Sequence, residues 1–207
     1  MKIICIGRNY AEHAKELNNP IPAQPVVFMK PASALLINRK PFYFPEFTKD
    51  IHYELEIVLK IGKNGRHVQP EFALDYIQEV GLGIDFTARD LQSELKAKGQ
   101  PWELAKGFDG SAVIGDFVEL NTLPGLSNIE FYLEKNGQKV QHGYSKDMLF
   151  SFQDIICFVS QYFKLQMGDY IYTGTPSGVG PIAIGDELRG VLMTKDGPKE
   201  VLACDIK

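Results

Sequence analysis

Ile51-His52-Tyr53-Glu54-Leu55-Glu56-Ile57-Val58-Leu59-Lys60 is the stretch around which the chain is organised. It has the composition of a β-strand, in which successive side chains point to opposite faces. Glu54 and Glu56 therefore share a face and lie roughly 7 Å apart at their Cα atoms. The opposite face carries apolar side chains. The stretch predicts a strand that presents two carboxylates side by side.

A second strand is predicted over residues 80–87, where apolar side chains alternate with Gly81, Gly83 and Asp85. On that face two positions have no side chain and the third is an acid. If the two strands are neighbours, Asp85 and the two glutamates converge above an emptied patch, where they could hold a hard divalent cation. Paired glutamates on a strand also mark an ordinary solvated face, and the two strands alone leave that alternative open.

Length and composition define the class of protein. The 207 residues, 44% of them hydrophobic and 23% charged, predict one globular domain. A net charge of −4 argues against a nucleic-acid partner. Cys5, Cys157 and Cys204 are odd in number and widely spaced, which favours buried thiols over disulfides or a zinc site. Without a signal peptide or an apolar run that could span a membrane, we expect a soluble, cytoplasmic protein.

Turn and helix signals indicate a β-rich, mixed α+β fold. In three hairpin signals Asn or Asp precedes Gly: Asn64-Gly65, Asn136-Gly137 and Asp196-Gly197. Short helices are predicted over residues 9–17, 70–77, 87–98 and 151–164. Their predicted N-caps include Asn9, Thr87 and Ser151.

Polar side chains recur at helical spacing in two of these helices. His13 and Glu16 are three residues apart, so they lie on one face of the first helix. Arg89 and Gln92 have the same spacing and follow Asp85 closely. Solvated helix faces also have this pattern, and the spacing alone does not distinguish the two interpretations.

Two further segments place polar groups among apolar residues. Lys106 lies in a mixed apolar run, where a lysine ordinarily extends its ammonium group to solvent. Thr173–Pro181 is glycine-rich but lacks the Gly-Lys-Ser/Thr ending of a nucleotide-binding loop. Its backbone N–H groups and the Thr175 hydroxyl could hold a small carboxylate, or the segment could be a plain tight turn.

Six motifs follow one another along the chain: Gly7-Arg8-Asn9-Tyr10-Ala11-Glu12-His13, Val27-Phe28-Met29-Lys30-Pro31, Glu54-Leu55-Glu56, Asp85-Phe86-Thr87-Ala88-Arg89-Asp90-Leu91-Gln92, Gly99-Gln100-Pro101-Trp102-Glu103-Leu104-Ala105-Lys106 and Thr173-Gly174-Thr175-Pro176-Ser177-Gly178-Val179-Gly180. Each motif is moderately specific, whereas the ordered set is highly specific and covers nearly the whole chain. The sequence resembles the fumarylacetoacetate hydrolase family, most nearly its small acylpyruvate hydrolase and oxaloacetate decarboxylase members.

The resemblance implies a β-rich roll with a mixed, twisted sheet, a single catalytic domain over residues 1–207, and a homodimer. It also implies a metal site, in which Mg²⁺ or Mn²⁺ is bound by Glu54, Glu56 and Asp85.

The same resemblance implies roles for the remaining polar residues. The 2-oxo-carboxylate end of a small-molecule substrate would be contacted by Arg89, Gln92, Lys106 and Thr175. His13 and Glu16 would form a lid dyad that activates water, with Lys106 as the third catalytic residue.

The implied reaction is metal-dependent cleavage of the C–C bond of an acylpyruvate, which gives pyruvate and a carboxylate. Decarboxylation of oxaloacetate forms the same enolate, so one site could support both reactions. The alternative is an isomerase or decarboxylase of unsaturated 2-oxo or 2-hydroxy diacids from aromatic catabolism. The dyad favours hydrolysis, because isomerisation requires no activated water. A non-catalytic binding module is a third interpretation, and the intact set of acid, base and ligand residues argues against it.

Overall fold

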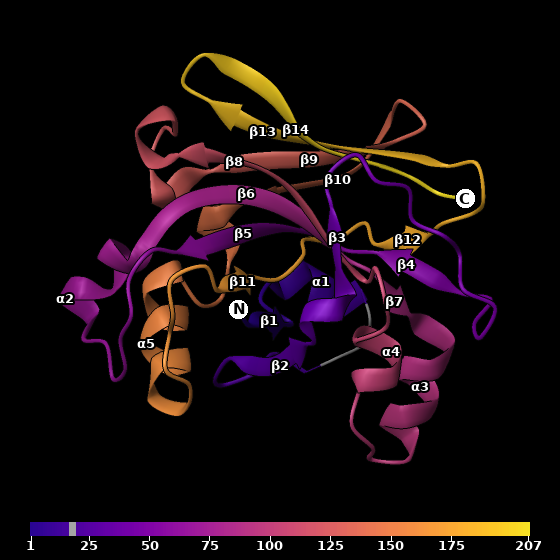
Figure 1. Cartoon of the computed structure of the whole chain (residues 1–207), viewed down its shortest axis with the longest axis horizontal. Coiled ribbons are helices and arrows are strands. Elements are labelled where there is room, and N and C mark those ends of the chain that lie inside the picture. Colours follow the sequence, from indigo (N-terminus) through magenta and orange to yellow (C-terminus); the bar gives the residue numbers. More distant parts are fainter. Residues whose placement is uncertain (17–19) are drawn as a thin grey trace.

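The computed structural model describes residues 1–16 and 20–207. Across those residues the chain is strand-rich and mixed α+β, as the sequence predicts (Figure 1). No helix in these two ranges is long and apolar enough to cross a membrane. The predicted helix end at Leu17, and the Asn18-Asn19 stop after it, lie outside the described residues.

A seven-stranded mixed sheet forms the centre of the molecule. Its strands, in spatial order, are β2 (Val26–Lys30), β1 (Ile3–Gly7), β11 (Tyr170–Tyr172), β5 (Leu55–Ile61), β6 (Ile77–Asp85), β8 (Ala112–Glu119) and β3 (Leu35–Ile37). The pairs β1–β11 and β3–β8 are parallel, and the other neighbours are antiparallel. The middle strands β5 and β6 are almost entirely buried, because both faces of the sheet are covered there.

A four-stranded antiparallel sheet covers one face of the central sheet and crosses the top of the molecule in Figure 1. It consists of β10 (Gln138–Tyr144), β9 (Glu130–Lys135), β13 (Glu187–Thr194) and β14 (Gly197–Asp205). The core between the sheets includes the fully buried side chains Leu55, Leu82, Phe131 and Leu202. Burial of each such side chain stabilises the fold by about 1.5–3 kcal/mol.

A small third sheet joins β12 (Gly180–Pro181), β4 (Ile51–Tyr53) and β7 (Thr87–Ala88). Its strands lead into or out of the central sheet: β4 precedes β5, and β7 follows β6. The sequence predicted one strand over residues 51–60, but the structure divides it between two sheets. Glu54 lies at the break between β4 and β5.

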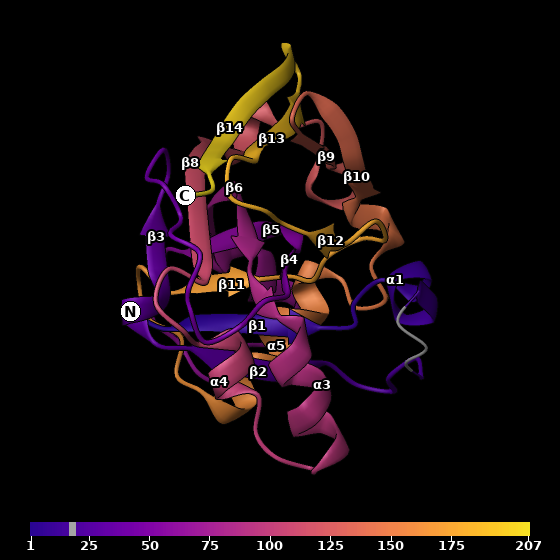
Figure 2. The same ribbon diagram turned by 90° about the vertical axis from the view of Figure 1, so that its right-hand side faces the viewer.

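The helices lie at the edges of this framework (Figures 1 and 2). They are α1 (Ala11–Glu16), α2 (Pro70–Ala73), α3 (Arg89–Ala97), α4 (Glu103–Lys106) and α5 (Phe152–Tyr162). Short 3₁₀ turns cover residues 32–34, 74–76, 120–122, 126–128 and 145–147. In both views α3 and α4 lie side by side, and α2 packs against α5.

Two of the three hairpin predictions are confirmed. Asn136-Gly137 joins β9 to β10, and Asp196-Gly197 joins β13 to β14. The prediction at Asn64-Gly65 is wrong. Gly65 instead pairs with Leu165, and the Asn64 side chain accepts a hydrogen bond from a backbone N–H of the same distant segment. A partner about a hundred residues away overrides the local turn preference.

Of the three helix-capping predictions, one is confirmed and two are wrong. Ser151 caps α5 through a complete capping box with Asp154. Asn9 does not act as predicted, because its side chain bonds Phe150 and Thr173 instead of the first turn of α1. Thr87 lies in β7 and caps no helix. Both polar side chains are used to fix distant segments near the candidate site.

Candidate active site

Three carboxylates meet where β4, β5 and β6 come together. Glu54 lies between β4 and β5, Glu56 is on β5, and Asp85 is the last residue of β6. Each offers an oxygen, and these oxygens lie within 4.8 Å of one another. The residues are 5%, 2% and 1% exposed, respectively. The structure therefore brings together the three predicted ligands, and the solvated-face alternative is wrong.

The predicted empty patch beside the glycines is also wrong. A Cβ atom at Gly83 would lie 2.5 Å from Cε1 of Tyr172 and 2.7 Å from the carbonyl oxygen of Val113. The missing side chain thus makes room for the Tyr172 ring, whose hydroxyl donates to the Val113 carbonyl oxygen at 2.6 Å. Gly83 serves packing behind the carboxylates, not access to them.

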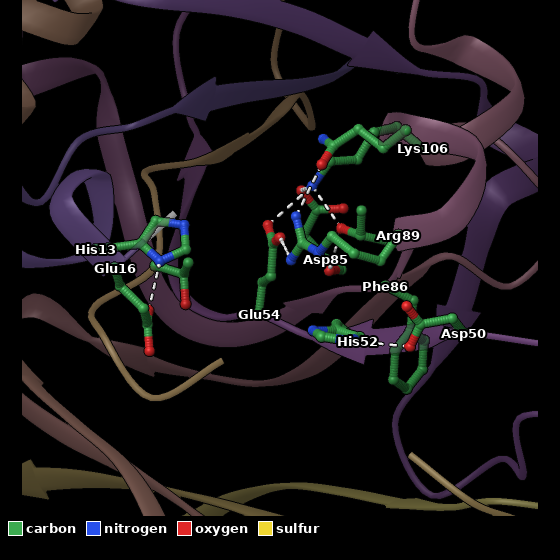
Figure 3. Close-up of polar contacts among 12 residues, drawn as sticks. His13, Glu16, Asp50, His52, Glu54, Asp85, Phe86, Arg89 and Lys106 are labelled. Carbon is green, nitrogen blue, oxygen red and sulfur yellow. Dashed lines mark hydrogen bonds and ion pairs between the residues drawn. The ribbon is translucent and has the colours of Figure 1, made fainter. Parts of the chain in front are cut away.

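Two buried lysines, Lys106 (labelled in Figure 3) and Lys30, balance the carboxylate charge. Lys106 Nζ lies 2.8 Å from Oε2 of Glu54, 2.6 Å from Oδ2 of Asp85 and 2.6 Å from the hydroxyl of Thr87. Lys30 Nζ lies 2.7 Å from Oδ1 of Asp85. The ordinary expectation that Lys106 reaches solvent is wrong, because its residue is 3% exposed. Lys30 was not among the predicted site residues.

Arg89 completes the positive side of the site. Its Nη2 lies 2.6 Å from Oε1 of Glu54, and its Nη1 donates to Oε1 of Gln92 at 2.8 Å. Both residues are in the first turns of α3, three positions apart, as the helical spacing predicts. Arg89 and Lys106 therefore occupy one oxygen each of the same Glu54 carboxylate.

This charge pattern separates the two glutamates. Burial alone would raise the pKa of Glu54, but the positive charges of Lys106 and Arg89 hold it well below its usual value. Burial, reinforced by repulsion from Asp85 and Glu54, raises the pKa of Glu56. Burial lowers the pKa of Lys106, but Asp85 and Glu54 outweigh it and raise that pKa. When no metal cation lies among the three carboxylates, ionising all three requires more free energy than ionising three separate carboxylates in water.

The residues present fit a divalent cation. Three buried carboxylates are the hard oxygen donors that Mg²⁺ and Mn²⁺ prefer. Oδ1 of Asp85 lies near Lys30 Nζ, yet within the described part of the chain it has no hydrogen bond of acceptable geometry. A buried carboxylate oxygen without a hydrogen bond is unusual, and a metal bond would satisfy it.

His13 and Glu16 lie on the other side of Glu54 from Lys106 in Figure 3. His13 is 5% exposed, and its Nδ1 lies 3.1 Å from Oε2 of Glu16. The other Glu16 oxygen accepts the backbone N–H of Gly178 at 3.0 Å. A carboxylate only accepts, so it favours the tautomer with the proton on Nδ1, which leaves the Nε2 lone pair of His13 unprotonated.

The glycine-rich segment supports the carboxylates from behind. Gly174 N–H donates to Oε2 of Glu56 at 2.6 Å. The Thr175 hydroxyl donates to the Leu55 carbonyl oxygen at 2.8 Å and accepts from Nε2 of Gln141 at 2.9 Å. The backbone N–H of this loop does hold a carboxylate, but it belongs to the protein itself. Thr175 lines the cavity with its hydroxyl already occupied.

A small cavity of about 30 Å³ unites the site. It is lined by all the predicted residues except Glu16: His13, Glu54, Glu56, Asp85, Arg89, Gln92, Lys106 and Thr175. It is also lined by residues for which the sequence predicted no role, among them Arg8, Phe28, Lys96 and Trp102. All but Lys96 lie in the motifs quoted above, and a lysine one turn beyond Gln92 on the same helix was a usable signal.

A comparison with protein families identifies the family to which a chain with this site belongs. The family model described as fumarylacetoacetate (FAA) hydrolase C-terminal matches residues 2–203. The chain belongs to the fumarylacetoacetate hydrolase family. The resemblance drawn from six motifs is thereby confirmed, and so is the strand-rich fold it implied.

Individual members of the family are similar over most of their length. The chain is 42% identical over 197 residues to bovine (Bos taurus) oxaloacetate tautomerase FAHD1, mitochondrial, covering 93% of this chain and 89% of that protein. It is 39% identical over 197 residues to oxaloacetate tautomerase YcgM of Escherichia coli, covering 95% and 89%. Fumarylpyruvate hydrolase of Pseudomonas aeruginosa, solved with Mn²⁺ and pyruvate, superposes with a TM-score of 0.92 at 32% identity, covering 100% and 89%.

Proposed function

We propose that this member of the family is a Mg²⁺- or Mn²⁺-dependent enzyme that forms the enolate of 2-oxo acids bearing a carbonyl at C4. The observation that carries the proposal is the buried meeting of three carboxylates with Lys106 and Arg89, faced by His13 across one cavity. Relatives named for oxaloacetate and fumarylpyruvate support this substrate class.

Glu54, Glu56 and Asp85 would hold the cation, which would act as a Lewis acid toward the 2-oxo group and stabilise developing negative charge. Lys106 and Arg89 would then turn from the carboxylates toward the substrate. Their charges stabilise the substrate carboxylate and the enolate oxygen in a site that excludes most water. Gln92 already accepts a hydrogen bond from Arg89, and it would hold the guanidinium in the orientation that meets the substrate carboxylate.

His13 supplies the proton transfers. Its unprotonated Nε2 accepts a proton, and Glu16 at Nδ1 stabilises the imidazolium that results. In tautomerisation the proton comes from C3 of the 2-oxo acid and is returned to the C2 oxygen, so the keto and enol forms interconvert. In hydrolysis the proton comes from water, whose oxygen bonds to C4; the C3–C4 bond then breaks and its electron pair forms the pyruvate enolate.

Keto–enol tautomerisation of oxaloacetate is the reaction we place first. Two relatives of that name are 39–42% identical over about nine-tenths of this chain. Hydrolysis of acylpyruvates is the second candidate function, and it is favoured by His13 with Glu16 and by the likeness to fumarylpyruvate hydrolase. Both reactions use the same metal ligands and the same cationic residues, so one active site serves them.

A side-by-side assay tests the proposal. Oxaloacetate, acetylpyruvate and fumarylpyruvate are compared with and without Mg²⁺, and the enol absorbance is followed separately from pyruvate release. We expect all turnover to require the metal and tautomerisation of oxaloacetate to be fastest. Turnover that survives complete removal of divalent cations contradicts the proposal. Absence of Mg²⁺ binding in calorimetry would revive the interpretation as a non-catalytic binding module.

The remaining features implied by the resemblance belong to the same proposal. We infer one catalytic domain over residues 1–207, a homodimer and a cytoplasmic location. Light scattering on the eluting protein tests the assembly, with twice the 23.2 kDa chain mass expected.

A further inference from the structure

Two basic side chains line the cavity without a partner. Arg8, after β1, and Lys96, on the last turn of α3, both border it. Among residues 1–16 and 20–207, neither makes an ion pair or a side-chain hydrogen bond. By contrast, Lys30 pairs with Asp85, Arg89 pairs with Glu54, and Lys106 pairs with both of these carboxylates. These three cations are therefore already engaged by Glu54 and Asp85, whereas Arg8 and Lys96 are not.

Trp102 lies close to both of these basic side chains. Lys96 Nζ lies 5.4 Å from the centroid of the Trp102 ring, and Cζ of Arg8 lies 6.0 Å from the same centroid. Contact of both cations with one aromatic ring offsets part of their mutual repulsion. Trp102, like the two cations, is half-buried, so this wall of the cavity is open to a ligand.

The strained backbone of Arg8 indicates that the surrounding structure requires this residue to point in one particular direction. Its φ is +59°, the left-handed region that residues with a side chain avoid. Such strain persists where the surrounding structure requires one particular direction, which is common at binding sites. Burial, followed by the charges of Arg8 and Arg89, lowers the pKa of Lys96 to about 8, which agrees with a cation lacking a counter-ion.

We infer that Arg8 and Lys96, arranged about Trp102, form a second anion subsite, which binds the far carboxylate of a dicarboxylic 2-oxo acid. This inference rests on the proposed function, since the 2-oxo-carboxylate end is assigned to the metal, Lys106 and Arg89. It narrows the substrate class: acids with a second carboxylate are preferred over acylpyruvates with a neutral acyl group. The subsite acts on binding and leaves the chemical steps to the other residues.

The test uses a pair of ligands that differ only at the far end. 2-Oxoglutarate and 2-oxovalerate have the same five-carbon chain, ending in a carboxylate and a methyl group respectively, and neither has a C4 carbonyl to react. Calorimetric titration of the full chain in Mg²⁺ should show 2-oxoglutarate binding at least about tenfold tighter, the effect of one charged hydrogen bond. In Lys96→Gln this preference should largely disappear, whereas binding of 2-oxovalerate should change little.

Further variants distinguish the effect of losing a charge from an effect on the folded structure. Lys98→Gln removes a charge from the same helix at an exposed residue paired with Glu94, and should retain the preference. Lys96→Arg keeps the charge and should retain most of it. Arg8→Gln should resemble Lys96→Gln. If that variant does not fold, the Lys96 series decides alone.

Each outcome has a distinct meaning. Equal binding of the two ligands by the unaltered protein, or an unchanged preference in Lys96→Gln, overturns the subsite. A preference for 2-oxoglutarate without any turnover of 2-oxo acids overturns the proposed function and leaves the subsite standing. Binding of neither ligand overturns both.

Discussion

The two sides of the cavity are built in opposite ways. The carboxylate side stands on the long, buried strands β5 and β6 and is neutralised by Lys30, Arg89 and Lys106. The dyad side stands on α1, which spans six of the described residues, and Glu16 accepts one backbone N–H from a neighbouring loop. The side chain of Glu16 is 32% exposed, whereas that of Glu54 is 7% exposed.

This difference matches two kinds of work. Stabilising an enolate requires fixed charges that do not rearrange during the reaction, and a buried strand pair provides them. Transferring a proton requires a base within reach of the substrate, and His13 lines the cavity that the cationic groups also line. Substitutions on the two sides should therefore have different signatures.

The largest effect is expected from Glu56→Gln, on the carboxylate side. The amide keeps the shape and can still accept the Gly174 N–H, but a charged metal ligand is lost. We expect metal binding at least about 100-fold weaker and all turnover lost. The metal-free form should be as stable as the parent or more so, because repulsion among three carboxylates is relieved. Calorimetry and thermal unfolding measure both; retained Mg²⁺-dependent turnover contradicts the metal assignment.

His13→Ala, on the dyad side, should split the reactions. Loss of a positioned base costs about 10² to 10⁴-fold in tautomerisation and hydrolysis, whereas oxaloacetate decarboxylation, which needs no such base, should remain within about tenfold. Pyruvate release and enol absorbance, measured on the same samples, give the ratio. Equal losses in all three reactions would make His13 a residue for closure or binding.

A smaller change with the same bias is expected from Glu16→Gln. The amide oxygen can still accept the Gly178 N–H, but the charge that stabilises the His13 imidazolium is gone. We expect hydrolysis to fall about tenfold, the value of one charge-assisted hydrogen bond, with KM little changed. A larger loss than in His13→Ala would show that Glu16 acts independently of the histidine.

The smallest expected effect is a pH dependence of kcat/KM that arises from Lys96, a residue of neither the carboxylate side nor the dyad side. The charged groups near Lys96 are Arg8, Arg89, Lys106 and Glu54, and the lowered pKa of Lys96, about 8, means that its charge is lost as the pH rises through that value. Values of kcat/KM for fumarylpyruvate should therefore decline above pH 8, whereas those for acetylpyruvate should not. In Lys96→Arg the decline should be absent, because a guanidinium stays charged. A parallel decline for both substrates assigns the titration to another group.

Local patterns predicted much of this site because its ligands obey strand and helix periodicity. The two-residue spacing of Glu54 and Glu56 and the three-residue spacing of Arg89 and Gln92 both place the pairs as expected. Motif order added candidate roles for residues such as Thr175, about which periodicity says nothing, and those roles stay predictions.

The failures have one cause, which is that the deciding partners are distant in sequence. Gly83 accommodates the ring of Tyr172, nearly ninety positions later. Thr87 accepts from Lys106 instead of capping a helix. Arg8 and Lys96 become neighbours only through Trp102. No local pattern contains these contacts.

The lysines that contact the carboxylates bear on how the protein acquires its metal. Since Lys30 and Lys106 pair with Asp85, we expect the polypeptide to fold with no divalent ion present. We expect folding to come first and metal binding to follow it. A chelated preparation should accordingly keep its circular dichroism spectrum and regain full turnover on addition of Mg²⁺.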